Sequence, residues 1–67
     1  MAARVPFAKV IDFLESHGWT LIRIWNPYRV FGKPGHLPIL VRVEGKTVDV
    51  DDYTRVQEIV RREAEQA

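Results

Sequence analysis

The sequence predicts a single α+β domain in the order helix, strand, strand, strand, helix, with both helices on one face of a three-stranded antiparallel sheet. Three observations predict this fold. Apolar residues recur at helical spacing near both ends of the chain, β-branched and aromatic residues dominate its middle, and turn-forming residues divide that middle at hairpin spacing. The chain has 67 residues, which suits one small domain over residues 1–67.

An amphipathic helix is expected over residues 6–17. Its apolar stripe repeats at i, i+3, i+4 and i+7 and consists of Phe7, Val10, Ile11 and Leu14. Pro6 is acceptable in a first helical turn, and Gly18 favours the end of the helix because glycine readily takes the left-handed conformation at C′. His17 is interpreted as a structural residue of this terminus, where a cation suits the helix dipole.

The middle of the chain is expected to form β-strands at 19–25, 28–33 and 38–44. It is rich in β-branched and aromatic residues, which favour strands. Three turn sequences stand at hairpin spacing, namely Asn26-Pro27, Lys33-Pro34-Gly35 and Glu44-Gly45-Lys46. A short fourth strand at 47–50 is left open, and it would present unpaired backbone groups at an edge of the sheet.

One face of the third strand is expected in the core. Residues on that side are Ile39, Val41 and Val43, and those on the open side are Leu40, Arg42 and Glu44. The alternation in the first strand does not show which of its faces lies in the core. One face has Ile22 and Ile24, and the other has Trp19, Leu21, Arg23 and Trp25. Trp19, next to the helix end, is interpreted as a core residue, and Trp25 is left open as core or as an exposed stacking platform.

A second helix follows a capping residue, Asp51 or Asp52. Its apolar stripe consists of Tyr53, Val56, Ile59 and Val60. Neither helix has another hydrophobic surface to bury, so both should cover the same face of the sheet.

The composition excludes several classes of protein. The absence of cysteine removes disulfides and thiolate metal sites and fits a cytoplasmic location. The sequence has no apolar run of roughly 18 residues and no signal-peptide pattern, so no membrane association is expected. His17 and His36 are too few for a metal site, and His36 is interpreted as an exposed turn residue. No glycine pattern for cradling phosphates is present, so neither metal nor cofactor is expected.

The charge is divided unevenly along the chain. Residues 18–48 hold five basic residues and one acidic residue, a net charge of +4, whereas residues 49–67 hold six acidic and three basic residues, a net charge of −3. Basic and aromatic residues interleave in the first hairpin, at 18–31, as is typical of an RNA-binding surface. The candidate RNA-binding residues are Arg23, Trp25, Tyr28, Arg29, Lys33, Arg42 and Lys46.

In its element order the chain resembles the double-stranded-RNA-binding fold, and its local sequence is similar to the HicA family of bacterial toxin–antitoxin systems over nearly the whole length. A helix ends in a glycine and an aromatic residue, at Gly18-Trp19, and an arginine, Arg23, comes before the first turn. An aromatic residue, Phe31, follows that turn, and two further turns match at Lys33-Pro34-Gly35 and Gly45-Lys46. The resemblance implies an mRNA interferase that acts without the ribosome and is neutralised by a HicB-like antitoxin.

The chain departs from this family at the catalytic positions. Tyr28, in Asn26-Pro27-Tyr28, stands where the family has the histidine of Gly-Ser-His, and Glu44 stands where a second histidine often lies. Metal-free RNA cleavage needs an acid and a base, and the pKa of histidine, about 6.5, suits that work better than that of tyrosine, about 10. We therefore expect RNA binding with impaired or absent ribonuclease activity.

Two other functions are left open. The first is an active interferase in which Glu44 serves as the base, Arg23 or Arg42 stabilises phosphate charge, and Tyr28 or His36 serves as a weak acid. The second is a protein-interaction or homodimerisation module without RNA binding, which would use an exposed edge strand or the acidic second helix.

Overall fold

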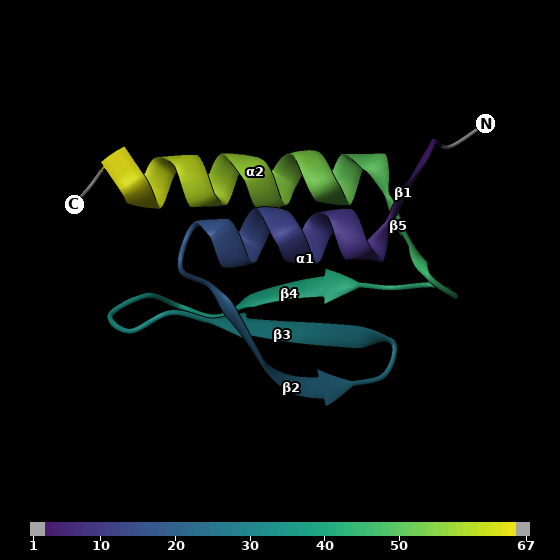
Figure 1. The fold of residues 1–67 in the computed structure, drawn as a ribbon, viewed down its shortest axis with the longest axis horizontal. Helices are drawn as coiled ribbons and strands as arrows, with labels where there is room; N and C mark the ends of the chain where they lie inside the picture. The colour runs from purple at the N-terminus through teal and green to yellow at the C-terminus, as the bar shows by residue number, and fades with distance from the viewer. Residues whose placement is uncertain (1–2, 66–67) are drawn as a thin grey trace.

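The computed structural model describes residues 3–65 and confirms the α+β fold (Figure 1). The elements along the chain are β1 (Arg4–Pro6), α1 (Phe7–Ser16), β2 (Thr20–Trp25), β3 (Tyr28–Gly32), β4 (Ile39–Arg42), β5 (Thr47–Asp49) and α2 (Val50–Glu65). Neither helix in this described part is long and apolar enough to cross a membrane.

The main sheet is antiparallel and has the strand order β2-β3-β4. Figure 1 shows α1 and α2 running alongside each other, with the sheet beneath them. One cluster of buried side chains joins all of these layers, with Val10 and Leu14 from α1, Val56 and Val60 from α2, and Phe31 from β3 among its members. Both helices therefore cover one face of the sheet, and the other face is open.

Trp19 is the largest fully buried side chain, 1% exposed, and it follows directly on the end of α1. That end is formed by Gly18, whose φ of +88° is the left-handed conformation expected of a helix-ending glycine. His17 is the C-terminal cap residue of α1, and its Nδ1 lies 2.8 Å from the Phe13 carbonyl oxygen. The structural interpretations of Trp19 and His17 are confirmed.

The core face of β2 is decided by a β-bulge. The register shifts between Leu21 and Arg23, so Leu21 pairs with Phe31 while Ile24 pairs with Arg29. The bulge adds one residue, so Leu21 and Ile24 share the helix side of the sheet. Trp25 pairs with Tyr28 and lies on the open side. Strict alternation, which grouped Ile24 with Ile22, was wrong for this strand because the bulge interrupts the period of two.

The strand expected at 47–50 is present as β5, but it does not extend the main sheet. It pairs with β1 in a separate two-stranded sheet, with Val5 opposite Val48. The unpaired edge expected at this strand is therefore occupied by β1, which the sequence analysis did not anticipate. A strand of three residues is too short to show an alternation, and its pairing depends on contacts more than forty positions away.

His36 is not the exposed turn residue that the sequence suggested. Its imidazole is half-buried, and its Nδ1 lies 2.6 Å from Glu63 Oε2, in a hydrogen bond that the carboxylate accepts. The same ring lies on Trp19, with 5.7 Å between the ring centroids. His36 thus connects the loop between β3 and β4 to the last turns of α2 and covers the core tryptophan.

Replacing His36 with alanine is expected to lower the free energy of unfolding by about 1–3 kcal/mol, because a hydrogen bond to a charged group and a ring contact are both lost. Urea denaturation followed by circular dichroism measures this change. Lys9→Ala is the control, since it shortens an exposed side chain of α1. An unchanged midpoint in His36→Ala would contradict the role assigned to the Glu63 contact.

Candidate nucleic-acid interface

The central feature of the open face is a row of three side chains that crosses the sheet. Tyr28 on β3 stands directly between Trp25 on β2 and Arg42 on β4, because it is the register partner of both. Residues paired in this way have neighbouring side chains on one face of an antiparallel sheet. Trp25 is 64% exposed and Tyr28 is 36% exposed, so both rings are accessible to a ligand.

A second row lies one step further along the strands. Arg23 pairs with Val30, and Val30 pairs with Leu40. Gly32 has no side chain on this face, and Ile22 occupies the space beside it. A Cβ at position 32 would lie only 2.8 Å from Ile22 Cδ1. The open-face surface, defined here as Arg23, Trp25, Tyr28, Leu40 and Arg42, therefore combines two aromatic rings, one aliphatic side chain and two guanidinium groups.

Glu44 closes one end of this surface. Its carboxylate lies 3.4 Å from Arg42 Nε and 4.0 Å from an Arg4 nitrogen. All three side chains are substantially exposed to water, so these ion pairs contribute at most about 1 kcal/mol each. Asp49 and Asp52 line the same shallow depression as these three residues. This depression therefore holds three carboxylates and two guanidinium groups, a formal charge of −1.

The structure brings together four of the seven candidate RNA-binding residues: Arg23, Trp25, Tyr28 and Arg42. Glu44, which the sequence analysis named as a candidate catalytic residue together with Tyr28, is adjacent to this group through its contact with Arg42. The arrangement brings two aromatic rings and two guanidinium groups together within two rows of one sheet.

The other three basic candidates lie elsewhere. Lys33 donates a hydrogen bond from Nζ to the His17 carbonyl oxygen, 3.1 Å away, and so covers the C-terminal end of α1. Arg29 alternates with Tyr28 and lies on the helix side of the sheet, where its guanidinium carbon is 5.8 Å from the centroid of the Phe7 ring. Lys46 lies in the turn before β5, near Phe7.

The residue pattern placed Leu40 on the open side, as found, but it left the face of Ile22 undecided and did not reveal the free edge of β2. The outer edge of β4 is contacted by Arg55, whose Nη2 donates to the Leu40 carbonyl oxygen at 3.1 Å. Among residues 3–65, no strand pairs with the outer edge of β2, and all six residues of this strand are exposed. The apolar residues on both sides of β2 were the available indication of this exposed surface. A strand that buries only one face leaves the apolar residues of its other face exposed to solvent.

Comparison of the chain with protein-family models, with curated proteins and with solved structures finds no match.

Proposed function

We propose that this chain is an RNA-binding domain of the HicA-like type that holds single-stranded RNA on its open-face surface. The observation that supports the proposal best is the cross-strand row in which Tyr28 stands between Trp25 and Arg42. Bases of single-stranded RNA stack on exposed aromatic rings of a sheet, and neighbouring arginines bind the phosphates. Bases of a duplex are already stacked and paired, so this surface favours single strands over double strands.

Arg23→Ala is expected to weaken RNA binding and to reduce its dependence on salt. Each phosphate contact on a single strand contributes about −0.7 to the slope of log K against log salt concentration, so one such contact should be lost. Fluorescence anisotropy with labelled single-stranded RNA at several salt concentrations measures both effects. Arg61→Ala is the matched control, because it removes the same charge from an exposed position on α2. Equal slopes for all three proteins would contradict the proposed phosphate contact.

The proposal includes impaired or absent cleavage. Neither Tyr28 nor Glu44 is an imidazole, and Glu44 is engaged by two arginines. It also includes action in the cytoplasm with a HicB-like antitoxin as partner. The reading frame beside the gene provides a direct check of that partner.

Cleavage by Glu44 is a second candidate function, favoured by the proximity of Glu44, Arg42 and Tyr28 at one end of the open face. In this case the Glu44 carboxylate takes the proton of a ribose 2′-hydroxyl, and the 2′-oxygen attacks the phosphorus as its bond to the 5′-oxygen breaks. Tyr28 protonates the leaving 5′-oxygen, and Arg42 stabilises the phosphate charge. Expression of the chain would then be toxic, and Glu44→Gln would abolish the toxicity. Harmless expression of the unaltered chain would exclude this candidate.

Homodimerisation is a third candidate, favoured by the free edge of β2. Two such edges can pair through their backbone groups and bury Ile22, Ile24 and Trp25, which are all more than 60% exposed. Light scattering decides this point. A monomer at high concentration would exclude it, and a dimer should dissociate in Ile24→Lys.

A further inference from the structure

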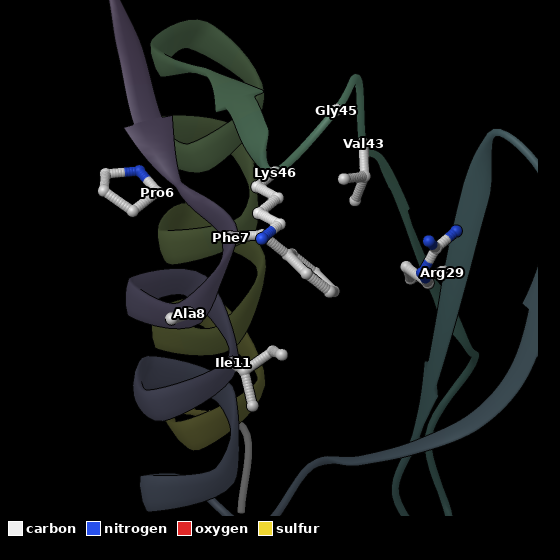
Figure 2. A pocket seen from close by; sticks show the side chains of 8 residues that line it. All are labelled: Pro6, Phe7, Ala8, Ile11, Arg29, Val43, Gly45 and Lys46. Atoms are coloured by element: carbon white, nitrogen blue, oxygen red, sulfur yellow. The ribbon is translucent and has the colours of Figure 1, made fainter.

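A groove lies on the helix side of the sheet, away from the open-face surface. It runs between the N-terminal half of α1, the turn that precedes β5, and β3, and its volume is about 450 Å³. Figure 2 shows Phe7 and Ile11 reaching from α1 into this space, with Arg29 on the opposite wall. Lys46 stands beside Phe7 at the rim. Pockets of roughly 300–1,000 Å³ are typical of ligand-binding sites.

The lining of the groove is mainly apolar. Val43 is buried, whereas Phe7 and Ile11 are half-buried and keep part of their apolar surface accessible. The Phe7 ring is held in place by Phe31, against which it packs edge-on with 6.4 Å between the ring centroids. Ala8 adds a small side chain, which leaves space between α1 and the turn. The groove can therefore take one or two apolar side chains without rearrangement of the core.

Both charged residues that line the groove are cations. Arg29 lies over the Phe7 ring, and its Nη1 also donates to Asn26 Oδ1 at 3.1 Å. Lys46 approaches from the other side. Within residues 3–65, neither residue forms an ion pair with a carboxylate. An apolar floor between two cations without a carboxylate partner is complementary to an apolar group that carries a negative charge beside it.

We infer that this groove binds a segment of a partner protein in which one or two large apolar side chains stand next to a carboxylate. The apolar side chain lies against Phe7 and Ile11, and the carboxylate is placed between Arg29 and Lys46. A second copy of this chain fits poorly. Its most exposed apolar residue, Leu37, is flanked by His36 and Pro38, without an acidic neighbour. RNA fits poorly as well, because Phe7 is the single aromatic residue that lines the groove and successive bases would find no second ring to stack on.

The test uses a fluorescein-labelled peptide with the central sequence Glu-Leu-Phe-Asp, titrated against the full chain and followed by fluorescence anisotropy. Saturable binding is expected. Binding should fall about tenfold or more with Lys46→Glu, because a charge attraction becomes a repulsion. Lys9→Glu is the matched control on an exposed site of α1 and should bind as the unaltered chain does. Circular dichroism of each variant confirms that it is folded.

Two control ligands decide what the groove recognises. A peptide with lysines in place of its acidic residues, and one with serines in place of Leu-Phe, should each bind at least about tenfold more weakly. Equal binding of either control, or binding of octanoate without any peptide binding, would overturn the inference. Amide NMR shifts should move at Ala8 and Gly45 and stay constant at Trp25.

RNA titrations keep this inference separate from the proposed function. Lys46→Glu should lose the peptide and keep RNA binding, because Lys46 lies outside the open-face surface. Loss of RNA binding in Lys46→Glu, with no peptide binding to the unaltered chain, would assign the groove to the RNA and overturn the inference. Loss of RNA binding in Tyr28→Ala alone leaves the groove intact and tests only the proposed function.

Discussion

Replacement of Trp19 with alanine is expected to leave the chain largely unfolded at room temperature. Trp19 is only 1% exposed and is the largest buried side chain of the described residues. Removal of such a side chain costs about 3–5 kcal/mol, because burial is lost and a cavity remains. In a chain of fewer than about 70–80 residues without disulfides, a single core rarely supplies more than about 3–5 kcal/mol, so the expected loss is as large as the whole stability. Circular dichroism with urea or thermal denaturation measures the effect.

Trp25→Ala is the matched control for this experiment. It removes the same side chain from a position that is 64% exposed, so the midpoint of unfolding should change little. The two tryptophans are thus assigned opposite roles, one in the core and one on the ligand-facing surface. A Trp25→Ala variant that unfolds as readily as Trp19→Ala would show that Trp25 is buried, and would contradict the open face as described.

The double variant Trp25→Ala, Tyr28→Ala is expected to lose most of its affinity for single-stranded RNA while it keeps its fold. Stacking of a base on an aromatic ring contributes about 1–3 kcal/mol, so each ring accounts for roughly 5- to 150-fold in affinity. Anisotropy titrations at one fixed salt concentration measure the change. The salt dependence should remain near that of the unaltered chain, because both cations of the surface are still present.

Tyr28→Phe is the control for the stacking contribution. It keeps the ring and removes the hydroxyl, so its RNA affinity should stay within a few-fold of the unaltered chain. If Tyr28→Phe binds as weakly as Tyr28→Ala, the hydroxyl and not the ring makes the contact, and the stacking model is wrong.

The helices and turns of the fold were predictable because they are determined locally. Phe7, Val10 and Leu14 show the helical period over two turns, and Gly18 marks the end of α1 with a conformation that glycine adopts without strain. Alternation in the third strand also placed Ile39 and Val41 in the core as expected. In each case neighbouring residues in the sequence carry the information.

The features that were not predictable depend on distant contacts. Pairing of β1 with β5 joins residues 4–6 to residues 47–49. The bulge at Ile22 depends on its fit over Gly32, across the hairpin. The first feature changes which strand edge is paired, and the second changes which side chains face the core. Neither can be recognised from the local pattern of residue types.

The candidate site was predictable in part for the same reason. Alternation in the third strand placed Arg42 on the open face, as found, whereas the face of Tyr28 was not assigned from the sequence. Arg29, Lys33 and Lys46 were grouped with the open-face residues by charge alone, and the charge of a residue does not show to which side of the sheet its side chain points. The structure turns Arg29 to the helix side and directs Lys33 to the end of α1, so that only part of the basic segment meets the open face.

The central claim is that RNA bases stack on the open face, and tryptophan fluorescence during an RNA titration tests it most directly. The chain has two tryptophans, of which only Trp25 is exposed. The account predicts that single-stranded RNA quenches the emission in a saturable way, that the quenching disappears in Trp25→Phe, and that duplex RNA quenches far less. Emission that does not respond to single-stranded RNA, or that responds equally in Trp25→Phe, would contradict it.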